Sequence, residues 1–124
     1  MVDTQHYVAY LFHSGATGGI METVLIDMFV VPEEARAAFL DRAHTAQRFI
    51  KTLPGFVEGF IYEQRAGTSQ HNVLTIAVWE DEQAFENAKQ AVASENQRQG
   101  INPQEVTKQL GIEFTRAVYA RTPY

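Results

Sequence analysis

The clearest pattern of hydrophobic and polar positions in the chain is an unbroken run of apolar and β-branched residues from Val73 to Trp79. Because it contains no charged residue, glycine or proline, the run predicts a β-strand. Its odd-numbered positions face one side of the sheet and its even-numbered positions face the other. A strand with one face in water would alternate apolar and polar residues, so we expect this strand to be covered on both sides.

Three further strands are predicted over residues 23–31, 56–65 and 112–121, where apolar and aromatic residues dominate. Apolar residues at three-to-four spacing predict two amphipathic helices, one after Pro32 and one from Asp81 to about Gln97. Asn102 followed by Pro103 is typical of the start of a third, short helix. Residues 66–72 form a loop that is short enough to join the second and third strands as a hairpin.

This order of elements predicts an α+β fold, namely a ferredoxin-like four-stranded antiparallel sheet with the helices on one face. The other face would then present about ten large apolar side chains, each worth roughly 1.5 to 3 kcal/mol when buried. A patch of that size indicates an interface. The simplest cover is a second copy of the sheet, so we expect a homodimer through the sheet face, with a shared barrel-like core.

Composition narrows the class of protein. The chain has 124 residues and no cysteine, which fits one domain in a reducing, cytoplasmic compartment. We divide it into an N-terminal arm over residues 1–20 and a domain over residues 21–124. The net charge is −5, and the acidic and basic residues are scattered along the chain without a basic cluster. This pattern disfavours nucleic acid as a partner. The apolar run from Tyr7 to Phe12 is too short for a signal peptide or a membrane span, so no membrane association is expected.

Several polar side chains stand in apolar surroundings. Asp27 lies between Ile26 and Met28 in a predicted strand, and it needs an arginine partner, a position at the sheet rim or a catalytic role. Arg42 falls within the apolar stripe of the first helix, from which it could reach an interior acid or an anionic ligand, although a side chain that extends along its stem to the helix edge is the more usual case. No metal site is predicted, although two histidines of the arm, His6 and His13, are possible ligands.

A ligand site is expected between the sheet and the helices. If the odd-numbered face of the Val73–Trp79 strand is the helix side, then Trp79, Phe85, Phe39 and Tyr62 form an aromatic lining. The small side chains at intervening positions, such as Thr75, indicate either close packing or an open pocket. An open pocket with this lining would suit a small, flat aromatic or apolar ligand.

Two segments resemble the antibiotic biosynthesis monooxygenase superfamily of dimeric α+β barrels. They are Pro54-Gly55-Phe56 before a strand and Val78-Trp79-Glu80-Asp81-Glu82-Gln83-Ala84-Phe85 at the start of a helix. The resemblance extends over about residues 23–119. It implies a homodimer that oxygenates a polycyclic phenol or quinol with O₂ and without metal or flavin, because the substrate anion itself reduces oxygen. Other members of the superfamily degrade haem or oxidise quinols.

The resemblance also suggests roles for individual residues. Trp79 matches the family's substrate-contacting tryptophan, while Thr75 stands at its asparagine position and Phe85 at its tyrosine position. Thr75 can donate a hydrogen bond to a developing oxyanion, but Phe85 cannot transfer a proton. The positions of the tryptophan and axial histidine of haem-degrading members hold Ala88 and Arg98, so haem is not expected.

Two hypotheses follow. In the first, the protein is a cofactor-independent monooxygenase, with catalytic Thr75, Trp79 and Asp27 and with substrate contacts from Phe85, Phe39, Tyr62, Arg42 and Arg116. In the second, it is a non-catalytic dimeric barrel that binds a small apolar ligand or only stabilises a complex.

Overall fold

A computed structural model describes residues 21–123 of the chain. Along the sequence its elements are β1 (Thr23–Val30), the 3₁₀ turn η1 (Glu33–Ala35), α2 (Arg36–Ile50), β2 (Phe56–Glu63), β3 (Val73–Trp79), α3 (Glu82–Gln99), α4 (Pro103–Gln109) and β4 (Glu113–Ala120). The proposed arm over residues 1–20, with His6 and His13, lies outside the described residues.

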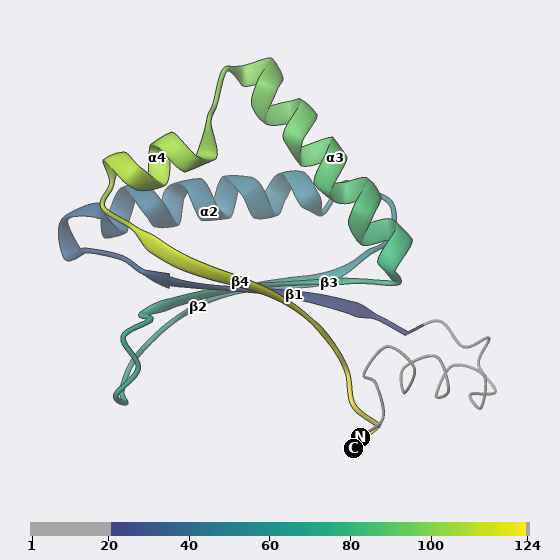
Figure 1. The fold of residues 1–124 in the computed structure, drawn as a ribbon, viewed down its shortest axis with the longest axis horizontal. Helices are drawn as coiled ribbons and strands as arrows, with labels where there is room; N and C mark the ends of the chain where they lie inside the picture. The colour runs from purple at the N-terminus through teal and green to yellow at the C-terminus, as the bar shows by residue number, and fades with distance from the viewer. Residues whose placement is uncertain (1–20, 124) are drawn as a thin grey trace.

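The four strands form one antiparallel sheet in the order β2-β3-β1-β4. The helices α2, α3 and α4 lie on the same side of this sheet (Figure 1). The prediction of a ferredoxin-like α+β fold is therefore confirmed. The register places the middle of β1 opposite the middle of both neighbours, because Asp27 pairs with Thr75 of β3 and with Arg116 of β4.

The helices begin where the sequence predicts. The side chain of Asp81 accepts a hydrogen bond from the backbone N–H of Ala84 at 2.7 Å and so caps α3. Asn102 caps α4 in the same way, and Pro103 occupies the first helical turn. The helix predicted after Pro32 differs slightly, since its first turn is the 3₁₀ turn η1 and α2 proper begins at Arg36.

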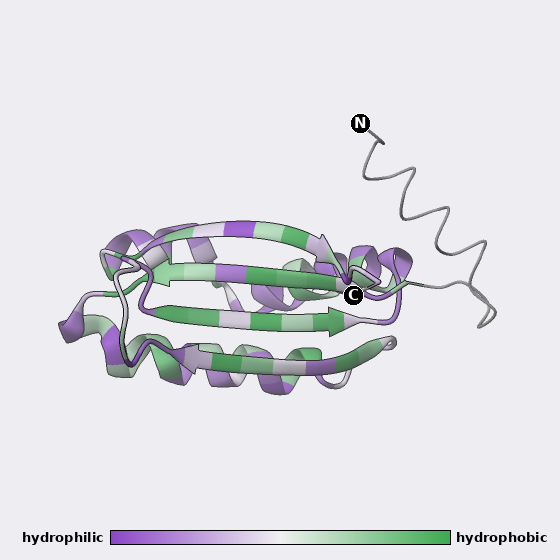
Figure 2. Ribbon diagram, turned by 90° about the horizontal axis from the view of Figure 1, so that it is seen from below, coloured by the Kyte–Doolittle hydropathy of each residue, from purple (hydrophilic) through white to green (hydrophobic). Residues whose placement is uncertain are grey.

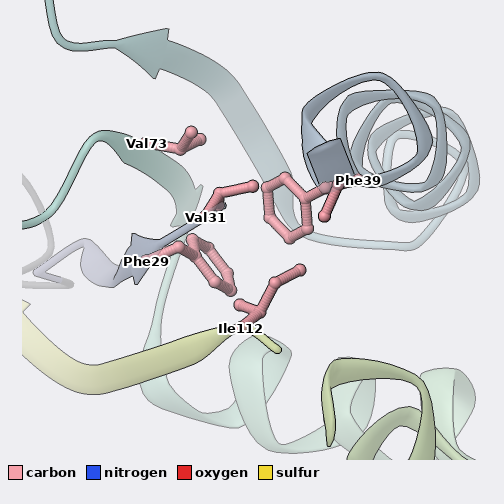
Figure 3. Packing of buried hydrophobic residues seen from close by; sticks show 6 residues of the cluster. Phe29, Val31, Phe39, Val73 and Ile112 are labelled. Carbon is pink, nitrogen blue, oxygen red and sulfur yellow. The ribbon is translucent and has the colours of Figure 1, made fainter. Parts of the chain in front are cut away.

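Buried side chains between the sheet and the helices form two separate apolar clusters. The first, shown in Figure 3, joins the end of β1 to α2 and to the segment before β4; it contains Phe29, Val31, Ala35, Phe39, Val73 and Ile112. The second joins the end of β3 to the first half of α3, and it contains Ala77, Trp79, Ala84, Phe85 and Ala88. The middle of the sheet, at Asp27, belongs to neither cluster.

The opposite face of the sheet carries no helix among the described residues, and its strands are largely hydrophobic (Figure 2). Since Leu25, Phe29 and Val73 pack on the helix side, their even-numbered neighbours in β1 and β3 point to this open face. Exposed aromatic side chains add to it from the two edge strands, namely Phe60, Tyr62 and Tyr119. Within residues 21–123, no helix is long and apolar enough to cross a lipid bilayer.

Candidate functional site

Three polar side chains lie side by side across the middle of the helix-facing side of the sheet. Thr75 of β3, Asp27 of β1 and Arg116 of β4 occupy matching register positions, and we call them the central polar row. Arg116 donates two hydrogen bonds to the Asp27 carboxylate, Nε to Oδ1 and Nη2 to Oδ2, both at 2.9 Å. Of the alternatives for Asp27, the structure shows the arginine partner that a buried carboxylate needs.

The two members of this ion pair differ in their access to water. The Asp27 side chain is 9% exposed, whereas the Arg116 side chain is 52% exposed. The hydrogen bond to Asp27 raises the pKa of Arg116, so the guanidinium stays charged across the physiological range. The pair therefore consists of a buried carboxylate and a guanidinium that is about half-exposed to solvent.

Trp79 stands on the same face of β3 as Thr75, about 13 Å further along the strand. Its residue is only 2% exposed, and its indole Nε1 has no hydrogen-bond acceptor among the described residues. An unpaired buried donor costs about 1 to 3 kcal/mol. A hydrogen bond from this N–H to an oxygen atom of a bound molecule would remove that cost, but the packed cluster around the indole would first have to open.

The joint between β3 and α3 fixes the position of Trp79. The backbone N–H of Glu80 donates a hydrogen bond to the carbonyl of Gly55 at 2.8 Å, which ties the joint to the turn before β2. Gly55 has a φ of 83°, and a side chain at this position would collide with Ala84 of α3. Phe56 then packs edge-on against the Trp79 ring, with 5.4 Å between the ring centroids. The segment Pro54-Gly55-Phe56 thus packs against one side of the Trp79 indole and holds it in place.

Cover over the helix-facing side of the sheet is uneven. The buried residues of α3 all lie in its first half, and Figure 1 shows the rest of α3 rising away from the sheet. On β4, by contrast, Phe114 and Val118 are exposed although they face the same side as the buried Phe29 and the half-buried Leu25. The part of the site nearest Trp79 is closely packed, and the accessible part lies over β1 and β4.

The aromatic residues predicted to line the site do not all meet. Trp79 and Phe85 share one apolar cluster. Phe39 belongs to the other cluster, where its ring centroid lies 4.7 Å from that of Phe29. Tyr62 is on the opposite face of the sheet, stacked against Phe60, so its predicted place beside Trp79 is wrong. The cause is an irregularity in the β2–β3 register between Phe56 and Glu58, which reverses the faces of all later residues in β2.

Arg42 also lies away from the site. It is exposed on α2 and forms no ion pair with another described residue, because the face of α2 that packs toward the sheet runs through Phe39, Leu40, Ala43, Gln47 and Ile50 instead. Of the two alternatives for Arg42, the exposed position agrees with a side chain that extends to the helix edge, and it rules out contact with an interior acid. Arg116 and Asp27, in contrast, are brought together with Thr75.

Two amides that sequence reasoning missed help to position the site. The Asn72 side chain accepts a hydrogen bond from the Val31 N–H and donates one to the Val31 carbonyl. This amide thus takes the place of a paired backbone residue just beyond the end of the β1–β3 ladder. Gln47 of α2 donates a hydrogen bond to the Ile76 carbonyl of β3 at 3.4 Å. The only sequence signal was the occurrence of an amide at the end of a loop and on an apolar helix face.

The sequence predictions concern two kinds of cofactor ligand, namely metal ligands and the axial ligand of haem. Within residues 21–123, no three histidine or acidic side chains cluster as metal ligands would. On α3, Ala88 is buried and Arg98 is paired with Glu95 at 2.7 Å, so neither position can supply an axial haem ligand.

Comparison with known proteins identifies both a family and a fold. The sequence profile of the antibiotic biosynthesis monooxygenase family matches residues 21–97. No curated protein sequence matches the chain significantly. Solved structures similar to it include a protein from Shewanella loihica assigned as a monooxygenase, with a TM-score of 0.65, 19% identity, and coverage of 84% of this chain and 97% of that one.

Two further structures are similar in the same way. One is a point variant of SnoaB, a cofactor-independent oxygenase from Streptomyces nogalater, with a TM-score of 0.60, 20% identity, and coverage of 83% of this chain and 95% of that one. The other is MupZ from Pseudomonas fluorescens, with a TM-score of 0.59, 16% identity, and coverage of 81% of this chain and 72% of that one. At such identities these likenesses establish the fold and leave the substrate open.

Proposed function

Because this chain belongs to the antibiotic biosynthesis monooxygenase family, we propose that it is a monooxygenase that oxidises an aromatic phenol or quinol with O₂, without a metal or flavin. The observation that carries the proposal is the unpaired Nε1 donor of Trp79, which lies on the same sheet face as the central polar row. Both are polar features in apolar surroundings, as expected of a site that orients a mostly apolar ligand through a few hydrogen bonds.

Each side chain has a definite role in this proposal. The substrate ring lies over Leu25 and β4, where the sheet is accessible, and one of its oxygens accepts the hydrogen bond of Trp79 Nε1 once the packed side chains around the indole move aside. Thr75 Oγ1 donates a hydrogen bond to the negative charge that develops on the reacting oxygen. Asp27 accepts a hydrogen bond from a substrate hydroxyl, and Arg116 keeps this carboxylate in place. Phe85 supports the indole through packing only, since it has no proton to transfer.

The reaction can be written for a simple probe. In 1,4-naphthohydroquinone, the ionised quinol gives electrons to O₂, one oxygen atom is inserted at the ring carbon next to a hydroxyl, and the other leaves as water. The products are 2-hydroxy-1,4-naphthoquinone and H₂O, so four electrons leave the substrate and reduce one O₂. Spontaneous oxidation instead gives the unhydroxylated quinone and hydrogen peroxide.

Oxygen consumption with this quinol and related hydroquinones tests the proposal. We expect the wild-type protein to raise the rate above that of buffer, and Thr75→Ala to lower the enzyme-dependent rate by roughly 10-fold to 100-fold, since it removes one donor to the developing charge. Thr45→Ala is the matched control, because Thr45 is exposed on α2 and bonds only to its own helix. A wild-type rate equal to that of buffer with every hydroquinone would refute the proposal.

A second candidate function is binding without turnover. Phe85 supports it, because this buried ring stands where the family's tyrosine would be and has no hydroxyl. Native mass spectrometry that finds a bound apolar ligand, together with no oxygen uptake, would favour this function over oxygenation.

We also propose that the open sheet face is the interface of a homodimer. The face is apolar on the central strands β1 and β3, and the edge strands add the exposed aromatic side chains Phe60, Tyr62 and Tyr119. Because Tyr119 is already about half-buried, its burial would gain roughly 1 kcal/mol. Two neighbours on β4 provide a matched test, since Tyr119 is 47% exposed on the open face and Val118 is 52% exposed on the helix side. In sedimentation velocity, Tyr119→Glu should dissociate the dimer and Val118→Glu should not. A wild-type monomer at micromolar concentration would contradict the proposed interface.

A further inference from the structure

We propose that Arg116 is a specificity-determining residue, which selects substrates that carry an ionised acidic oxygen next to the aromatic ring. The inference rests on the proposed function, and it names the charge state of the molecule that the site accepts. It follows from the geometry of the ion pair with Asp27 and from what surrounds the outward edge of the guanidinium.

The guanidinium is only partly used by its partner. It has five N–H donors in a rigid plane, and Asp27 engages one on Nε and one on Nη2. No other hydrogen bond from Arg116 to a described residue is present. Two donors of Nη1 and the second donor of Nη2 therefore remain. One Nη1 donor and the free Nη2 donor lie side by side at the end of the guanidinium, and we call this pair the outer edge. This edge matches two neighbouring oxygens of an anion, as in a carboxylate or an ionised hydroxyquinone.

Asp27 makes this edge a fixed recognition element. A free arginine side chain loses rotamer entropy when it binds a ligand, but the bidentate pair already holds Arg116 across β1. The carboxylate weakens but does not cancel the attraction for a second anion, because it binds the neighbouring Nε/Nη2 edge and is further from the ligand than the N–H donors are. Since Arg116 is half-exposed, its outer edge is open to a ligand on the helix side of the sheet.

The neighbourhood suits an aromatic anion in particular. Phe114 and Val118 flank Arg116 on the same face of β4, and both are exposed apolar side chains. Lys89 is the other cation near the aromatic residues, but it lies 5.0 Å from the centroid of the Phe85 ring and is paired with Glu86 at 3.1 Å. Arg116 is thus the cation set within an accessible apolar strip, where a ring and its acidic oxygen can bind together.

A preference for the anionic substrate would also favour its oxidation by O₂. A quinol transfers electrons to O₂ far more readily as an anion than as a neutral molecule. A guanidinium within hydrogen-bond distance favours the ionised form of a bound hydroxyl. Arg116 would therefore act twice, first by selecting the acidic substrate and then by keeping it in the reactive state.

Two naphthoquinones of nearly the same size test the inference without turnover. At neutral pH 2-hydroxy-1,4-naphthoquinone is an anion, whereas 2-methoxy-1,4-naphthoquinone is neutral. Both quench indole fluorescence, and the chain contains a single tryptophan, so titration of Trp79 emission reports binding close to the site. We expect the wild-type protein to bind the anion about tenfold more tightly than the neutral probe, as one charge-assisted hydrogen-bonded contact allows.

Variants of the ion pair separate recognition from structural support. Arg116→Lys should keep part of the preference. The double variant Asp27→Asn/Arg116→Gln replaces the pair with neutral amides of similar size, and it should bind both probes with equal affinity. A preference for the anion that persists in the double variant would overturn the inference, as would an equal loss of affinity for both probes.

The outcome is distinguishable from that of the oxygenation proposal. A charge preference that depends on Arg116, without oxygen uptake, would support the inference and refute only the oxygenation. Oxygen uptake with no preference for the anionic probe would refute the inference alone. If neither probe quenched Trp79 in the wild-type protein, the inference would be overturned together with the proposed location of the site.

Discussion

Removal of Arg116 should destabilise the fold more than neutralisation of Asp27, although each change breaks the same ion pair. Arg116→Met keeps the apolar stem of the side chain but leaves the buried Asp27 carboxylate without a partner. Loss of one partner from a fully buried pair costs about 3 to 5 kcal/mol. Because half of the Arg116 side chain is exposed, water can partly reach the carboxylate, and we reduce the expected cost to about 2 to 3 kcal/mol.

The reciprocal change leaves a different group behind. In Asp27→Asn the guanidinium loses its carboxylate, but it is half-exposed and can be hydrated with little movement of the chain. The asparagine oxygen can still accept one of the two hydrogen bonds. We therefore expect a cost of about 1 kcal/mol, close to the value of an exposed pair.

Urea unfolding followed by circular dichroism measures both costs, at one protein concentration so that association contributes equally. The double variant Asp27→Asn/Arg116→Met should cost less than the sum of the single variants, since the unpaired charge is gone. If Asp27→Asn proved as costly as Arg116→Met, the carboxylate would not be the sequestered member of the pair, and the proposed asymmetry of the site would be refuted.

Further predictions concern the elements around the site. Gly55→Ala should cost at least about 2 kcal/mol in thermal unfolding, because it combines a positive φ with a collision, whereas Gly100→Ala, at a positive φ but with open space around it, should cost only about 1 kcal/mol. Asp81→Ala removes the cap of α3 and should lower stability by about 1 kcal/mol in urea unfolding; no change would mean that the cap is not needed. The pKa of Glu95 is lowered from 4.5 to about 2, mainly by the hydrogen bond that its carboxylate accepts from Arg98. The ionised Glu95 therefore stabilises the fold above pH 4.5, and this contribution is lost as the pH falls toward 2. Between pH 4.5 and 2 the unfolding free energy of Glu95→Gln should therefore fall less steeply with pH than that of the wild type. An equal slope in the two proteins would contradict the lowered pKa of Glu95.

Much of the fold could be predicted because local signals agree with the tertiary structure. The uncharged Val73–Trp79 run, the caps at Asp81 and Asn102 and the turn at Gly55 each specify their element from nearby residues alone. The ion pair of Asp27 was predictable in kind, because a carboxylate in an apolar strand needs a counter-charge. Its partner at Arg116 followed only from the register of β1 with β4.

The errors arose where one residue changes the geometry of a whole element. The irregularity between Phe56 and Glu58 reverses the face of Tyr62, and its sequence signal is the neighbouring Gly59, which is typical of a bulge but does not fix its position. On α2, alanines fit either a buried or an exposed face, so the stripe that included Arg42 could not be distinguished from the true one. The unpaired Nε1 of Trp79 likewise depends on packing that no local pattern specifies.

Mass spectrometry of the product formed from 1,4-naphthohydroquinone under oxygen-18 gas tests the proposed activity most directly. The account predicts that the wild-type protein yields 2-hydroxy-1,4-naphthoquinone with one oxygen-18 atom, and that Thr75→Ala yields much less of it. Unhydroxylated quinone with hydrogen peroxide as the only products, at the rate seen in buffer, would contradict the assignment as a monooxygenase of this substrate class.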